Sequence, residues 1–172
     1  MIVELVGPPG IGKTFFLKHN KIKGIRQNSF FFRIISKILY MVLNVKTKSY
    51  SDKKVAYKLV QYKISTIIGV NLIADEALTQ YMINRVVDGT LSIDEAICFL
   101  KKIYLNYRIN IMLFHNDNRK IVYQRLIKRN TNSYSKMSFR EYCEYCEEFY
   151  RILNLISKGT KNEKNICNFY NS

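Results

Sequence analysis

Short apolar runs alternate with longer amphipathic stretches along most of the chain. Four runs have the length and composition of buried strands, at residues 2–6, 70–74, 108–114 and 166–170. A further segment, 21–26, is either a short strand or a loop. Strands separated by helical segments predict an α/β fold, a three-layer sandwich in which helices cover both faces of a parallel sheet of four or five strands.

The amphipathic stretches predict the helices between these strands. In residues 28–44, for example, apolar side chains recur at intervals of three and four. Further helices are expected at 12–19, 53–68, 78–87 and 118–129, and two more begin at the pairs Ser92/Glu95 and Ser138/Glu141. Such Ser-x-x-Glu spacing is typical of a capping box, and Gly159 is expected to end the last helix. Residues 1–172 are expected to form a single domain.

The stretch Gly7-Pro8-Pro9-Gly10-Ile11-Gly12-Lys13-Thr14 matches the phosphate-binding pattern G-x-x-x-x-G-K-[ST] in full. It follows a predicted strand and opens a predicted helix, which is the context that the pattern requires. Its glycines allow backbone N–H groups to turn toward a phosphate without meeting a side chain. Lys13 is then expected to reach the β- and γ-phosphates of ATP, and the Thr14 hydroxyl to bind Mg²⁺. The alternative, an ordinary Gly/Pro turn, is the weaker interpretation.

Two acidic residues, Asp75 and Glu76, follow the predicted strand at 70–74. A buried strand that ends in an acid places its carboxylate at the edge of the sheet where α/β proteins bind ligands. Asp75 is therefore a candidate ligand of Mg²⁺, and Glu76 a candidate catalytic group that orients or deprotonates the attacking group. The alternative is that Asp75 caps the next helix.

Composition adds less to this picture. The chain has 172 residues, of which 48% are hydrophobic, and its longest apolar run is too short to span a bilayer, so a cytoplasmic protein is expected. The pair Cys143/Cys146 has the spacing of half a metal site, but both residues fall on the apolar stripe of a helix, which favours core packing. His115, at the end of a predicted strand, can contact a ligand but is more often a packing residue in that position.

The formal net charge of +15 indicates an anionic partner or a solvated basic surface. Since the chain has no run of five basic residues, a nucleic-acid partner is not favoured over nucleotide phosphates. The expected partners are thus ATP and an unidentified small-molecule acceptor, and a second copy of the chain, in a homodimer, is a further candidate.

The motif at 7–14, the acid at Asp75, Asp117 after the next strand and the helix that contains Arg125, Leu126 and Arg129 together resemble the nucleoside monophosphate kinase superfamily, in particular its thymidylate-kinase-like members. The resemblance covers nearly the whole chain and implies the P-loop NTPase fold of nucleotide kinases, with ATP and Mg²⁺ as cofactors. It also implies a lid at about 125–138, in which Arg125 and Arg129 bind ATP or the transferring phosphoryl group as catalytic residues.

The acceptor is not implied by this resemblance, because residues 75–80 lack the Arg and Ser that thymidylate kinases carry there. We expect it to bind between the helices of 28–68 and segment 76–88, near Lys37, Gln61, Gln80 and Arg85. The sequence therefore predicts an ATP-dependent kinase of a nucleotide, nucleoside or related metabolite. Two alternatives are a P-loop ATPase that couples hydrolysis to movement, and a nucleotide- or nucleic-acid-binding protein without kinase activity.

Overall fold

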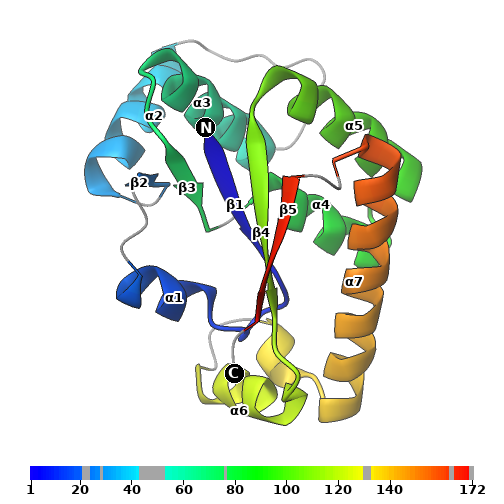
Figure 1. Cartoon of the computed structure of the whole chain (residues 1–172). Coiled ribbons are helices and arrows are strands. Elements are labelled where there is room, and N and C mark those ends of the chain that lie inside the picture. Colours follow the sequence, from blue (N-terminus) through cyan, green and yellow to red (C-terminus); the bar gives the residue numbers. More distant parts are fainter. Residues whose placement is uncertain are drawn as a thin grey trace.

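The sheet that organises the molecule is fully parallel. The computed structural model describes residues 1–20, 24–27, 29–42, 53–75, 77–129, 133–162 and 165–170. Its five strands are β1 (Ile2–Val6), β2 (Ile25–Arg26), β3 (Leu72–Ala74), β4 (Ile109–His115) and β5 (Ile166–Tyr170). They lie in the order β2-β3-β1-β4-β5 (Figure 1). The α/β fold with a parallel sheet of four or five strands is confirmed, and segment 21–26 contributes a two-residue strand.

The helices occupy the connections between the strands. They are α1 (Lys13–His19), α2 (Phe30–Val42), α3 (Lys53–Ile67), α4 (Leu78–Val87), α5 (Ile93–Asn106), α6 (Arg119–Arg129) and α7 (Phe139–Thr160), with a short 3₁₀ helix, η1 (Ser133–Lys136), before α7. The expected helices at 28–44 and 53–68 thus form at Phe30–Val42 and Lys53–Ile67, and residues 28, 43 and 44 lie outside the described part. Among the described residues, no helix is long and apolar enough to cross a membrane.

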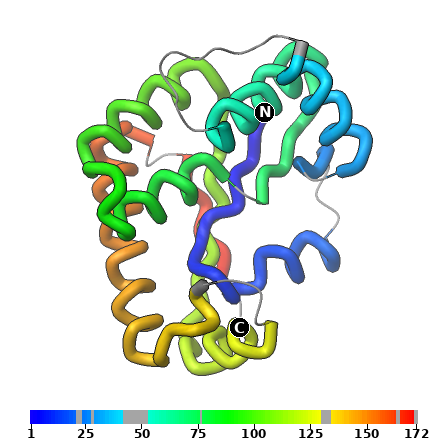
Figure 2. Tube along the Cα trace, turned by 180° about the vertical axis from the view of Figure 1, so that it is seen from behind, coloured from blue at the N-terminus to red at the C-terminus, as the bar shows by residue number. Residues whose placement is uncertain are grey.

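Helices lie on both faces of the sheet. On one face, Tyr62 of α3 and the first turn of α4 contact Glu4 of β1. On the other face, the ring of Phe16 in α1 packs against Phe114 of β4 and Phe169 of β5, with ring centroids 5.2 and 4.6 Å apart. Figure 2 shows α3, α4 and α5 lying together over one face. This arrangement confirms three layers, with β1 as the central strand.

Local sequence rules predict the starts of α5 and α7 but not the end of α7. Both expected capping boxes form, at Ser92 with Glu95 and at Ser138 with Glu141. The expected end of α7 at Gly159 is wrong, because the helix continues to Thr160. A Cβ atom at Gly159 would lie 2.8 Å from Cδ1 of Ile97. Gly159 therefore allows α7 to approach α5 closely, and this tertiary contact is not visible in the local sequence.

Candidate functional site

The loop between β1 and α1 needs glycine where its backbone turns. Gly10 and Gly12 have φ angles of 86° and 104°, which L-residues with side chains rarely adopt. At Gly10 there is also no room, because a Cβ atom would lie 2.9 Å from the backbone oxygen of Val122 in α6. At Gly7 a Cβ atom would lie 3.1 Å from that of Phe114. The glycines of the motif thus serve both backbone conformation and close packing.

Neighbouring elements hold this loop in place. The hydroxyl of Tyr142 in α7 donates a hydrogen bond of 2.8 Å to the carbonyl of Pro9. Pro8 and Ile11 are buried, Ile11 with 4% of its surface exposed. Because the loop is fixed by β4, α6 and α7 before any ligand arrives, its N–H groups need little reorganisation to bind one.

Lys13 extends from the first turn of α1 across the loop. Its ammonium group donates to the backbone carbonyl of Gly7 and to Oε1 of Gln80 in α4, the latter at 2.8 Å. Burial lowers the pKa of Lys13 to about 7, and the Asp75 carboxylate opposes this shift. The structure therefore brings Lys13 to Asp75 and Gln80, which lie more than 60 residues later in the sequence.

Thr14 and Asp75, the predicted magnesium ligands, lie at the start of α1 and directly after β3. The Thr14 side chain is exposed and that of Asp75 is half-buried. A hydroxyl and a carboxylate fit Mg²⁺, which prefers oxygen ligands and often keeps several waters when only one or two protein groups bind it. Glu76, the predicted catalytic group, lies outside the described residues.

The two arginines predicted to act from a lid are exposed on α6. The buried face of this helix, formed by Val122 and Leu126, contacts Gly10 of the loop. Arg129 follows Val122 by seven residues, which places it on the side of the helix that faces the loop, and Arg125 directly precedes Leu126. Contact of Arg125 and Arg129 with nucleotide remains a prediction.

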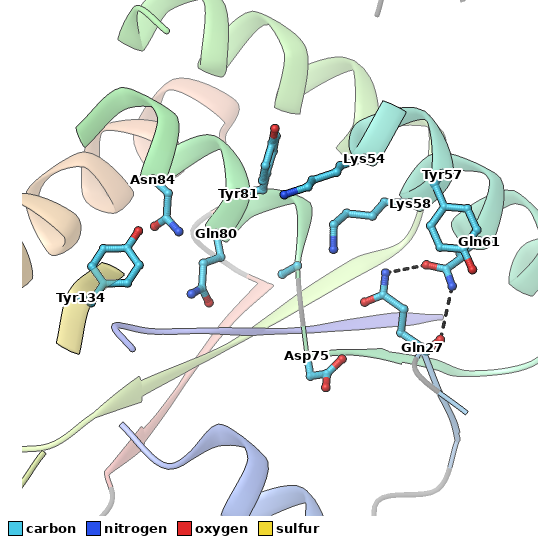
Figure 3. Close-up of a pocket in the computed structure, with 11 residues that line it drawn as sticks. Gln27, Lys54, Tyr57, Lys58, Gln61, Asp75, Gln80, Tyr81, Asn84 and Tyr134 are labelled. Atoms are coloured by element: carbon cyan, nitrogen blue, oxygen red, sulfur yellow. Dashed lines mark hydrogen bonds between the residues drawn. The ribbon is translucent and has the colours of Figure 1, made fainter. Parts of the chain in front are cut away.

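A cavity of about 580 Å³ lies beside the loop, between α3, α4, β3 and η1 (Figure 3). It is lined by Gln27, Lys54, Tyr57, Lys58, Gln61, Asp75, Ala77, Gln80, Tyr81, Asn84 and Tyr134. Gln27 and Gln61 lie on one side of the group in this view, and Gln80, Asn84 and Tyr134 on the other. The wall is mostly polar and aromatic, and its size suits a small metabolite.

Of the four residues expected near the acceptor, two line the cavity and two do not. Gln61 and Gln80 line the cavity, and their contact with an acceptor stays a prediction. Lys37, in contrast, is exposed on α2. Arg85 lies at the end of α4, where its guanidinium donates to the carbonyl of Thr90 at 3.3 Å. Tyr134 of η1 lines the cavity, so the segment predicted as the lid forms part of the wall.

Gln27 is a cavity residue that the sequence analysis missed. Its Nε2 donates to Oε1 of Gln61 at 2.6 Å, and Nε2 of Gln61 donates to the Gln27 backbone carbonyl at 3.3 Å. Gln27 is only 3% exposed, yet its Oε1 has no hydrogen-bond partner. A polar residue after a strand was the available signal, but the sequence left segment 21–26 undecided between strand and loop.

Glu4, the second missed residue, is fully buried in the central strand. Its carboxylate accepts hydrogen bonds from the Tyr62 hydroxyl at 2.5 Å and from the backbone N–H groups of Leu78 and Thr79 at 3.2 and 3.3 Å. Burial raises the pKa of Glu4, and the hydrogen bonds from Thr79 and Tyr62 lower it in part. Glu4 thus fixes the start of α4, the helix that carries Gln80. An acid inside an otherwise apolar strand was the sequence signal.

The remaining candidates pack in the interior or on the surface. Cys146 is 4% exposed and burial raises the pKa of its thiol to about 11, in agreement with core packing. Among the described residues, no three His, Cys, Asp or Glu side chains form a group that could hold a metal ion. The ring of His115 lies between those of Tyr150 and Tyr170, with centroids 5.2 and 5.0 Å away. The packing interpretation of His115 therefore holds in this structure.

The sequence matches no protein-family model and no curated protein. Solved structures that resemble the chain include two of deoxyadenosine kinase from M. mycoides, one with the products dCMP and a flexible dCDP bound and one with dATP bound. They are 16% and 15% identical to this chain, each with a TM-score of 0.46, over 100% of this chain and 90% of theirs. At this identity and TM-score, the likeness assigns neither a substrate nor a residue role to this chain.

Proposed function

We propose that the protein is an ATP-dependent phosphotransferase, a small-molecule kinase that binds Mg-ATP on the loop 7–14 and phosphorylates a nucleotide, nucleoside or related metabolite in the adjoining cavity. The observation that supports this most is the position of Lys13. Its ammonium group donates one hydrogen bond to a carbonyl inside the loop and another to Gln80 in the cavity wall. A group transferred from the loop to the cavity would pass this side chain.

Several groups of the chain fit the work of such a reaction. Bound Mg-ATP would supply the phosphoryl group and the positive charge that its oxygens need. The loop N–H groups and Lys13 would hold the phosphates, while Thr14 and Asp75 would hold the metal ion. Glu76 would orient or deprotonate the attacking group. The half-buried position of Lys13 strengthens its interaction with a phosphate, because little water competes there.

The segment at about 125–138 would act as a lid in this proposal. Tyr134 lines the cavity, and the Tyr123 hydroxyl in α6 donates to the carbonyl of Met137 at 2.6 Å. A movement of α6 would therefore carry the cavity wall with it. Arg125 and Arg129, which lie on α6, would approach the transferring phosphoryl group and help to exclude water. The thymidylate-kinase-like assignment and a cytoplasmic location belong to the same proposal.

The test is ADP release from Mg-ATP, measured with and without a panel of nucleosides, nucleoside monophosphates and sugar phosphates. We expect one acceptor class to stimulate release. Steady release without any acceptor would instead indicate an ATPase, and ATP binding without release would indicate a nucleotide-binding protein. Running the assay at low and moderate salt separates specific turnover from nonspecific attraction to the basic surface.

A further inference from the structure

Two buried side-chain atoms among the described residues lack a hydrogen-bond partner, Oε1 of Gln27 and Nδ2 of Asn162. Such atoms are rare, because an unpaired buried polar group loses its hydration without compensation. Asn162 lies after α7 and lines a different cavity, with Met1 and Arg108 at the amino ends of β1 and β4. Gln27 follows β2 and lies at the carboxyl edge of the sheet, the edge that carries the candidate site.

The orientation of the Gln27 carboxamide is fixed by its neighbours. Its backbone N–H donates to the carbonyl of Ile73 at 2.8 Å, and its Nε2 donates to Gln61. Turning the amide over would bring Oε1 of Gln27 against Oε1 of Gln61, since Nε2 of Gln61 is already directed to the Gln27 backbone carbonyl. The unpaired atom is therefore an oxygen, and only a hydrogen-bond donor can satisfy it.

This oxygen lies near the position where the acceptor would react. Arg26 pairs with Ile73, so Gln27 lies beside the end of β3 and one residue short of Asp75. In Figure 3 the free oxygen of Gln27 is turned away from Gln61, toward the interior of the group of lining residues. The oxygen is buried, so a ligand reaches it by displacing a neighbouring lining side chain. The amide oxygen of Gln27, which can only accept a hydrogen bond, thus lies beside the end of the strand that carries Asp75, the residue that would hold the metal ion in the proposed reaction.

The unpaired oxygen of Gln27 favours a hydroxyl over a phosphate as the reacting group of the acceptor. A hydroxyl donates a hydrogen bond to an amide oxygen, whereas a phosphate brings negative charge and mostly lacks a donor at neutral pH. Lys54 and Lys58 also line the cavity, on α3, and both make interactions within the protein. Three tyrosines, Tyr57, Tyr81 and Tyr134, add aromatic surface of the kind that planar rings pack against.

We infer that Gln27 contacts the acceptor through its unpaired Oε1, and that the acceptor is a hydroxyl-bearing molecule of the nucleoside type rather than a nucleoside monophosphate. This inference rests on the proposed kinase function and specifies its substrate. Gln27 acts as a positioning residue, because a neutral amide can hold the hydroxyl but cannot accept its proton.

The first experiment uses the wild-type protein with adenosine, cytidine, guanosine, uridine and thymidine, each against its own 5′-monophosphate. We expect acceptor-dependent ADP release with at least one nucleoside and at least tenfold less with its monophosphate. Release that only monophosphates stimulate overturns the inference but leaves the kinase proposal intact. Thermal shifts with a non-hydrolysable ATP analogue measure binding of the same pairs. If no acceptor stimulates ADP release, the kinase proposal is wrong. A thermal shift with monophosphates but not with nucleosides would contradict the inference about the acceptor, whatever the result for ADP release.

The second experiment compares Gln27→Leu with Gln27→Glu and uses Asn162→Leu as the matched control, a buried amide with an unpaired atom at the other end of the sheet. Loss of one neutral hydrogen bond is expected to raise the KM for the nucleoside about 5- to 10-fold in Gln27→Leu. The KM for ATP should stay within about twofold, on the same scale of interaction. Gln27→Glu keeps an oxygen in place, and its buried carboxyl group, which favours the protonated form, can donate to Oε1 of Gln61 as Nε2 does in the wild type, so the nucleoside KM should recover. Asn162→Leu should match the wild type.

Two kinetic results would contradict a role of Gln27 in acceptor binding. Equal nucleoside KM values for Gln27→Leu and Asn162→Leu would remove Gln27 from acceptor binding. Parallel increases in the KM values for ATP and nucleoside, together with a lowered Tm and no recovery in Gln27→Glu, would make Gln27 a structural residue only. If Gln27→Leu does not fold, the comparison of Gln27→Glu with the wild type and the paired acceptor panel still decides the question.

Discussion

Lys13 is the single residue on which the proposed phosphoryl transfer depends most, since it contacts both the loop and Gln80. We expect Lys13→Ala to lower turnover by about 10²-fold or more, the scale of losing one preorganised donor to the transition state. Lys18→Ala, which removes an exposed charge from the same helix, is the control and should change turnover little. Steady-state ADP release measures both, and near-normal turnover in Lys13→Ala would remove Lys13 from the mechanism.

Arg129 allows a test of the lid at the same scale. If Arg129 acts on the transferring group, Arg129→Ala lowers kcat more than it weakens ATP binding, because only interactions made in the transition state change kcat. The neighbouring exposed Lys128→Ala provides the matched control. Kinetics and equilibrium ATP binding should be measured on the same preparations, and equal losses in both would make Arg129 a binding residue.

Among the elements, the contact between the loop and α6 is open to a direct test. Ala at Gly10 would combine a positive φ with a Cβ atom 2.9 Å from the Val122 carbonyl. Gly89 also has a positive φ, but a Cβ atom there would meet nothing within 4 Å. We expect Gly89→Ala to cost about 1–2 kcal/mol of stability from backbone strain alone, and Gly10→Ala about 1–3 kcal/mol more from the clash. Urea unfolding measures the difference in the free energy of unfolding between the two variants. Equal losses of stability would mean that α6 moves away from a Cβ atom at position 10 with little loss of energy.

The hydrogen bonds between β1 and α4 should show in the pH dependence of stability. Burial raises the pKa of Glu4 above its ordinary value of 4.5, so the folded chain keeps this proton to a higher pH than the unfolded chain does. The contribution of Glu4 to stability therefore falls as pH rises above about 4.5. The stability of Glu4→Gln relative to the wild type should thus increase between pH 4 and 7 in thermal unfolding.

Glu95→Gln is the control of opposite sign. The backbone N–H and hydroxyl of Ser92 lower the pKa of the Glu95 carboxyl. Its contribution is present above the unfolded pKa and is lost as pH falls. Relative to the wild type, the stability of Glu95→Gln should therefore decrease as pH rises through this range. If the stability of Glu4→Gln relative to the wild type also decreased as pH rises, the folded protein would stabilise the charged form of Glu4 rather than destabilise it.

At the scale of the whole molecule, the formal net charge of +15 is the dominant feature. Attraction to nucleic acid through such a surface depends on counterion release and falls steeply with salt, by about 10³-fold for six phosphate contacts between 50 and 200 mM. The proposed binding of phosphate by the fixed loop beside the half-buried Lys13 would be screened much less. We expect acceptor-dependent ADP release to change less than about tenfold over this range, on the scale of a few screened contacts. A parallel loss of acceptor-dependent ADP release and of nucleic-acid binding would indicate that both depend on the exposed basic surface rather than on the fixed loop.

The features that the sequence predicted are those that depend on neighbouring residues in the chain. The capping boxes, the strand and helix order and the loop 7–14 depend on residues within a few positions of each other. Gln61 and Gln80, which the sequence predicted to lie near the acceptor, both line the cavity. Gln27 and Glu4 were missed, because their partners lie 34 residues away in Gln61 and 58 residues away in Tyr62. Gly159 was misread for the same reason, since its neighbour Ile97 belongs to another helix.

The sequence by itself determined the glycine-rich loop 7–14, because glycine spacing and the flanking strand and helix fix its backbone path. It also determined the parallel α/β order of elements. Only the tertiary structure decided that Lys13 reaches Gln80 and that Glu4 holds the start of α4. The tertiary structure also decided that Gln27 presents an unpaired oxygen beside a cavity of about 580 Å³. These contacts join separate elements across the sheet edge, and their geometry follows from how the helices pack, which no local pattern specifies.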